Sequence, residues 1–89
     1  MAHSKQARKR VRVNERKAQE NRVYRSASRT LIRRALEAIE NGDEETARDA
    51  VARAVRQLDK TASRGVIHRN NAARRKSRLI ARLNQMESA

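Results

Sequence analysis

The chain has 89 residues, and its 23 Lys and Arg against 10 Asp and Glu give a formal net charge of +13. It contains no Cys, which excludes disulfides and thiolate metal sites and is compatible with a reducing compartment. No apolar run approaches the roughly 18 residues of a membrane span, and no signal peptide opens the chain. We therefore expect one cytoplasmic domain, residues 1–89, with a polyanion as its partner.

Two glycines are the only strong breaks in a chain that lacks proline. The first predicted helix runs from about Ser4 to Asn41 and ends at Gly42, where glycine can adopt the left-handed cap conformation. A second helix opens at Asp43 and ends near Gly65, and a third follows. The sequence thus predicts an all-α fold, a three-helix bundle with a long, projecting N-terminal helix.

Each predicted helix carries an apolar stripe at helical spacing. In the second helix the stripe consists of Ala47, Ala50, Val51, Ala54, Val55, Leu58 and Ala62. In the first it begins only at Tyr24 and continues through Leu31, Ile32, Ala35, Leu36, Ala38 and Ile39. In the third it comprises Ala72, Leu79, Leu83 and Met86, with Arg74, Arg75, Arg78 and Arg82 on the other side. Nearly half of the apolar residues are alanine, so the core should be small and the isolated protein marginally stable.

The first helix lacks an apolar face over its early half. At 1.5 Å per residue, a helix over 4–41 is roughly 55 Å long, about twice the length of the other two. We therefore divide the domain into a basic arm, residues 1–23, and a three-helix bundle, residues 24–89. The arm has no packing surface, so it should fray when free and become helical against its partner.

Charge is segregated along the chain, and this favours a nucleic-acid partner over a merely solvated tail. Residues 1–34, 35–63 and 64–89 carry net charges of +10, −3 and +6. Both ends are therefore suited to a polyanion and the middle is not. Arginine outnumbers lysine 18 to 5, and its planar guanidinium bridges phosphate oxygens or stacks on bases, although genome composition or growth temperature would produce the same bias.

The candidate nucleic-acid-binding residues fall into two groups. On the first helix they are Lys5, Arg8, Lys9, Arg10, Arg12, Arg16, Lys17, Asn21, Arg22, Arg25, Ser26, Arg29, Arg33 and Arg34. The second group comprises His68, Arg69, Asn70, Arg74, Arg75, Lys76 and Arg78, in which Lys76 lies on the apolar side and is open to a snorkelling role. Further polar residues, such as Ser28, are candidate donors to phosphate or 2′-hydroxyl groups.

Several of these residues have ordinary structural alternatives. Asn70 is equally suited to capping the third helix, and His68 to a local hydrogen bond in the turn. A metal role for His68 is disfavoured because the only other histidine is His3, in the arm. The lone aromatic residue, Tyr24, suits packing at the bundle edge, so base stacking is not expected to be the main device. The sequence shows no nucleophile–base pair and no phosphate-binding glycine loop, so we expect neither an enzyme nor a cofactor.

Two stretches resemble the family of bacterial small-subunit ribosomal protein number twenty, over essentially the full chain. The stronger is similar to the family's Gly-x-Ile-His-Lys-Asn-x-Ala-Ala-Arg-x-Lys-Ser signature, with Arg69 in place of lysine, and comprises Gly65, Ile67, His68, Arg69, Asn70, Ala72, Ala73, Arg74, Lys76, Ser77 and Leu79. The weaker covers Lys5 to Arg10 with Glu15, Arg16, Asn21, Arg25, Ser26, Arg29 and Thr30. His3 and Ser4 depart from the family's usual Asn and Ile at the tip of the arm.

This resemblance implies a function as well as a fold. It implies a three-helix bundle that binds small-subunit ribosomal RNA directly and early in assembly, touching the 5′ domain and the long penultimate helix. Two rival hypotheses rest on charge alone. One is a DNA-compacting protein without preference for RNA, and the other is an amphipathic binder of anionic membranes or partner helices, which the lack of Trp and Phe disfavours.

Overall fold

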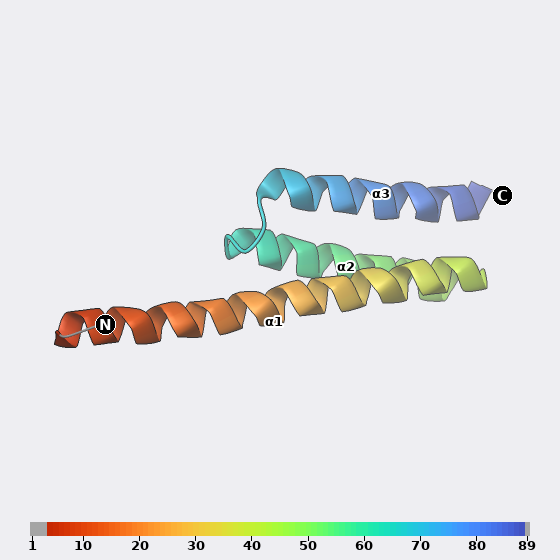
Figure 1. Ribbon diagram of the computed structural model, residues 1–89. Helices are drawn as coiled ribbons and strands as arrows, with labels where there is room; N and C mark the ends of the chain where they lie inside the picture. Colours follow the sequence, from red (N-terminus) through yellow and green to blue (C-terminus); the bar gives the residue numbers. More distant parts are fainter. Residues whose placement is uncertain (1–3, 89) are drawn as a thin grey trace.

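The computed structural model describes residues 4–88, which form three α-helices and no strand (Figure 1). The helices are α1 (Lys5–Asn41), α2 (Glu44–Ser63) and α3 (Arg69–Ser88). The predicted all-α class and the long first helix are confirmed, and the predicted limits of α1 and α2 agree with the observed ones to within a residue or two. His3, at the tip of the predicted arm, lies outside the described residues.

The sequence chemistry at the helix ends explains where the elements begin and stop. The Ser4 hydroxyl accepts a hydrogen bond from the Ala7 amide at 3.1 Å, and the Asp43 carboxylate accepts from the Thr46 amide at 3.4 Å. The Thr46 hydroxyl also donates to Asp43, and these bonds hold the pKa of the Asp43 carboxyl below its usual value. Gly42 has a φ of 80°, a conformation that disfavours any residue with a Cβ, so the turn between α1 and α2 needs glycine.

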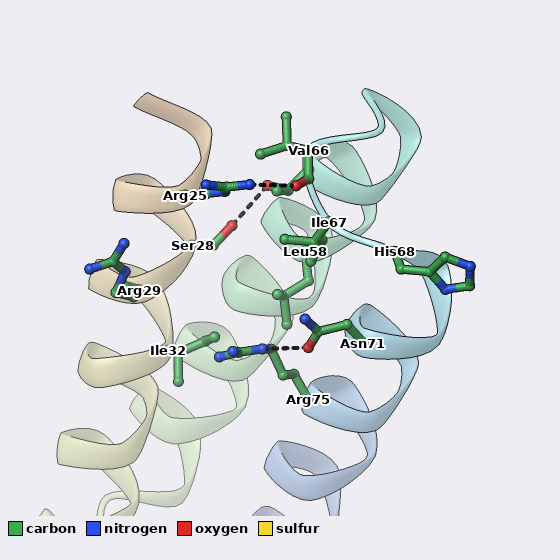
Figure 2. A pocket seen from close by; sticks show the side chains of 11 residues that line it. Arg25, Ser28, Arg29, Ile32, Leu58, Val66, Ile67, His68, Asn71 and Arg75 are labelled. Atoms are coloured by element: carbon green, nitrogen blue, oxygen red, sulfur yellow. Dashed lines mark hydrogen bonds between the residues drawn. The ribbon is translucent and has the colours of Figure 1, made fainter. Parts of the chain in front are cut away.

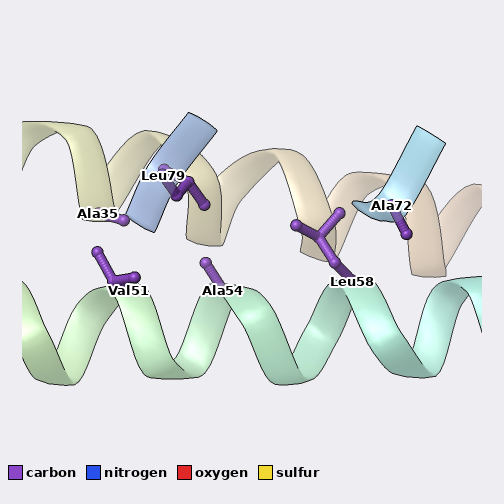
Figure 3. Packing of buried hydrophobic residues seen from close by; sticks show 6 residues of the cluster. All are labelled: Ala35, Val51, Ala54, Leu58, Ala72 and Leu79. Carbon is purple, nitrogen blue, oxygen red and sulfur yellow. The ribbon is translucent and has the colours of Figure 1, made fainter. Parts of the chain in front are cut away.

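The core is thin and lies mainly on α2. Figure 1 shows α2 beside α1 with α3 running alongside, and the contacts of α2 with each neighbour are more extensive than those between α1 and α3. Figure 3 shows the buried cluster, in which alanines let the helices approach closely and Leu58, 1% exposed, supplies the largest fully buried apolar side chain. Its members are Ala35, Val51, Ala54, Leu58, Ala72 and Leu79. The predicted stripes therefore form the core.

One candidate phosphate donor, Ser28, has a hydrogen-bond partner inside the bundle. Ser28 is 7% exposed and its hydroxyl lies 2.8 Å from that of Thr61, which is fully buried. The Thr61 hydroxyl donates its single hydrogen to the Gln57 carbonyl at 2.8 Å, so Ser28 must be the donor in the pair. Ser28 lies on the buried arc of α1, where a hydroxyl needs a partner, and its single hydrogen is used within the bundle.

The N-terminal half of α1 projects beyond the other two helices. The molecule measures 63 × 21 × 16 Å, and the red and orange part of α1 in Figure 1 extends past both neighbours. No residue between Lys5 and Ala27 is buried. None of the helices in the described part of the chain combines the length and apolar character needed to cross a membrane.

Candidate nucleic-acid interface

The cations of the projecting half of α1 are exposed and carry uncompensated charge. Between Lys5 and Arg22 every Lys and Arg side chain lies on the surface. Within residues 4–88, none of these cations has a carboxylate within 4.0 Å, although Glu15 and Glu20 belong to the same segment. Charges of one sign on a narrow rod raise the local concentration of a polyanion around it.

Further along α1 the predicted residues divide between two flanks of the helix. Arg22, Ser26, Arg29 and Arg33 line one shallow hollow together with Thr30. Arg34 lies on the other flank, in a second hollow that Arg22 and Ser26 also border and whose apolar members include Val23 and Leu31. Arg33 makes a long, exposed ion pair with Glu37 at 3.9 Å, which contributes little and leaves the guanidinium accessible.

The arginines predicted on α3 are all exposed. Arg74, Arg75 and Arg78 lie on the surface, as does Arg69 in the first turn. Arg75 is held by its own helix, because its Nε donates to the Asn71 side-chain oxygen at 2.8 Å. Only one of the five N–H donors of the guanidinium group is used in this bond, so the other four are free to bind an anion.

The first turn of α3 shows the local role of His68, while RNA contacts by His68 and Asn70 stay predictions. The His68 carbonyl accepts from the Ala72 amide, and its Nδ1 accepts from the Asn70 amide, both at 3.1 Å. His68 therefore caps α3, which begins at Arg69, so the structure does not show the capping role that was one of two alternatives for Asn70. Since Nδ1 is an acceptor, Nε2 carries the proton and is the donor left for an outside partner. Figure 2 shows the imidazole pointing outward, away from α1.

Lys76 has a partner within the protein. Its Nζ lies 2.7 Å from the Asp59 carboxylate of α2, and its side chain is 31% exposed. Its partial burial agrees with the snorkelling alternative, and the ammonium joins α3 to α2. The charge of Lys76 is thus balanced locally, unlike that of the neighbouring arginines.

Ion pairs also balance much of the charge on the outer surface of α2. Arg48 contacts Glu87 of α3 at 2.6 Å and Glu44 at 3.4 Å, and Arg53 contacts Asp49 at 3.1 Å. The hydrogen bond that Arg48 donates to Glu87 raises the pKa of its guanidinium further. The acid-leaning middle segment therefore forms a surface of mixed charge.

One groove brings predicted residues of the first helix together with those of the third (Figure 2). It has a volume of about 430 Å³ and lies between α1, the turn after α2, and α3. Arg25 crosses from α1 and donates to the Val66 carbonyl at 3.3 Å, while Arg75 reaches from α3 toward Ile32. Arg29 and His68 lie at its edges. No Asp or Glu occurs among the described residues that line it.

Comparison with known protein families identifies the chain. The family described as Ribosomal protein S20 matches residues 2–84. The chain belongs to this family. S20-family proteins are ribosomal proteins, so the chain is a ribosomal protein of the small subunit and not an enzyme. The resemblance drawn from the turn and first half of the third helix is confirmed.

Individual S20-family relatives agree over nearly their whole length. The small ribosomal subunit protein bS20 of Francisella philomiragia is 49% identical over 89 residues, covering 100% of this chain and 99% of the relative. The bS20 protein of Colwellia psychrerythraea is 52% identical over 81 residues, covering 91% and 94%. That of Beutenbergia cavernae is 51% identical over 79 residues, covering 89% and 92%.

The sequence alone did not predict the apolar part of the groove. The residues that line it include Leu58, which was expected in the core, and Val66 and Ile67, for which no binding role was expected. A signal for it does exist. Two β-branched apolar residues, Val66 and Ile67, follow a glycine and precede a helix start, so they must cover the end of the bundle. Within residues 4–88, no group of three or more His, Cys, Asp or Glu side chains gathers as a metal site.

Proposed function

We propose that this protein binds small-subunit ribosomal RNA directly and bridges RNA segments during assembly of the subunit, in the cytoplasm. The observation that supports this most strongly is the placement of unbalanced charge. The arm on α1 and the arginines of α3 with the groove are separate surfaces, while α2 presents mixed charge. A molecule of this kind neutralises phosphates on two RNA segments that would otherwise repel one another.

The arm and the bundle have different tasks in this proposal. The arm, residues 1–23, lies along one RNA segment and contacts phosphates on all sides of its helix. The bundle, residues 24–89, presents the cations of the second half of α1 together with those of α3. The mixed-charge surface of α2 faces away from the RNA, because its carboxylates would meet phosphate with like charge.

Replacing Arg74, Arg75 and Arg78 together by glutamine should weaken binding to a small-subunit rRNA transcript. Each lost phosphate contact flattens the dependence of log Kd on log salt by about 0.7 to 0.9, so the triple variant should lose roughly 2 to 3. The measurement is a filter-binding or anisotropy titration at several salt concentrations. The matched control replaces Arg53, Arg56 and Lys60 of α2, and it should leave the slope nearly unchanged. If the slope of log Kd against log salt were unaltered in the α3 variant, these arginines would not be part of the RNA interface.

Competition between nucleic acids separates the proposal from a general DNA-compacting role. Folded small-subunit rRNA should displace labelled rRNA from the protein at a much lower phosphate concentration than duplex DNA does. The reason is that the arm and the α3 surface belong to one rigid protein and can bind two neighbouring RNA segments at the same time. A single DNA duplex binds only one of the two surfaces at a time. If duplex DNA competed equally well, phosphate by phosphate, the DNA-binding hypothesis would replace ours.

A further inference from the structure

We propose that the groove between α1 and α3 takes one unstacked nucleotide of the RNA, with its base on the apolar floor and its phosphate beside the two anchored guanidinium groups. This inference rests on the proposed function, since it assumes that RNA is the partner. It adds that one nucleotide is held by shape as well as by charge. The groove is the one of Figure 2, with a volume of about 430 Å³.

The floor of the groove suits a base and does not suit a phosphate. The apolar surface of the groove comes mainly from the half-buried side chains of Ile32 of α1 and Ile67 of the turn, with the buried Leu58 behind them. An ionised phosphate would lose hydration on such a surface without gaining a hydrogen bond. The face of a base is apolar, and ligand sites that take planar groups combine such a floor with a few polar groups at the edge.

The charged groups of the groove are fixed in place before any ligand arrives. Arg25 is bonded to the Val66 carbonyl at 3.3 Å, and Arg75 to the Asn71 oxygen at 2.8 Å. In Figure 2 these two side chains point into the gap between α1 and α3 from opposite helices. Each keeps four of its five N–H donors for a phosphate or a base edge, and less rotamer freedom is lost on binding. The absence of acidic side chains among the lining residues completes the match to an anionic ligand.

A stacked duplex cannot use this groove. Its bases are covered by their neighbours, and its phosphates would reach only the edge. RNA-binding proteins that recognise individual residues do so at loops and bulges, where a base is free to leave the stack. The ring of Tyr24 is covered by the Arg64 guanidinium, 5.1 Å from its centroid, so aliphatic side chains and guanidinium planes take the place of an aromatic platform.

The test fills the groove without changing its charge. The variant Ile67→Phe enlarges one wall, and the matched control Ile80→Phe makes the same change on α3 at a side chain that is 43% exposed and lies outside the groove. Both proteins are titrated with a small-subunit rRNA transcript, and 2′-hydroxyl acylation of the complex is mapped at nucleotide resolution. Circular dichroism verifies folding, and Ile32→Phe repeats the test from the opposite wall.

We expect Ile67→Phe to raise Kd by about five- to tenfold, the scale of losing one base contact, with an unchanged salt slope. One nucleotide that the unaltered protein protects should regain reactivity, while the rest of the footprint and the control remain as before. A wild-type Kd and footprint in both groove variants would overturn this inference alone. A flatter salt slope with no nucleotide released would assign only phosphate to the groove and would also overturn it. Failure of the unaltered protein to bind would overturn the proposed function as well.

Discussion

Replacing Arg8, Arg10, Arg12 and Arg16 of the arm by glutamine is expected to remove about half of the salt dependence that the arm contributes to rRNA binding, since these are four of its eight Lys and Arg. These side chains are exposed, and within residues 4–88 they have no ion-pair partner, so each is free to displace a counterion from phosphate. Four lost contacts at about 0.7 to 0.9 each flatten the slope of log Kd against log salt by roughly 3. Titrations between low and physiological salt measure this directly.

A control variant that loses the same number of charges elsewhere tests whether the position of the cations matters, and not only their number. Replacing Arg48, Arg53, Arg56 and Lys60 of α2 by glutamine lowers the formal net charge of +13 by the same four units. Two of these four are engaged in ion pairs, and the proposal turns their helix away from the RNA. The α2 variant should keep a slope within about 1 of the unaltered protein. Equal losses in the two variants would show that net charge alone drives binding.

Leu58→Ala should cost about 2 to 5 kcal/mol of folding free energy, the usual range for emptying a closely packed leucine site. Leu58 is 1% exposed and lies among alanines of all three helices, which have little side chain with which to fill the space. Small domains are marginally stable, so this loss should leave a large fraction of the isolated protein unfolded. Urea denaturation followed by circular dichroism measures the loss.

Two further measurements help to interpret the result for Leu58→Ala: a control at an exposed residue and a rescue by RNA. Ile80→Ala removes a side chain that is 43% exposed and should cost well under half as much. RNA at a hundred times its Kd should return about 2.7 kcal/mol to Leu58→Ala, because it binds the folded form. A Leu58→Ala protein with unaltered stability would mean that the alanine-lined contacts, and not the leucine, hold α2 in place.

The fold could be predicted because its determinants are local. Gly42 and Gly65 are the two strong breaks of the chain, and both adopt positive φ where the helices end. The stripe of α2 repeats without interruption, so its buried face follows from spacing alone. The arm could be recognised by the absence of such a face. These features need no knowledge of what packs against what.

The site could be predicted only in part because the groove depends on tertiary packing. Exposed arginines follow from the helical wheel, but the approach of Arg25 to Val66, 41 residues away, does not. Ser28 was a candidate donor to RNA because the sequence does not show whether a hydroxyl faces water or Thr61. Asn70 was one candidate for the cap of α3 because asparagine is a common cap, whereas a histidine side chain fills that role here.

The continuity of α1 gives the protein a fixed span. The helix runs from Lys5 to Asn41 without a glycine or proline, so no hinge separates its tip from the part that packs on α2. One inserted residue near Lys17 would advance everything before it by about 1.5 Å and swing it by about 100° around the axis. Seven would restore the angle to within about 20° and add roughly 10 Å. The number of residues in α1 thus sets both the distance and the angle between the tip of the arm and the bundle.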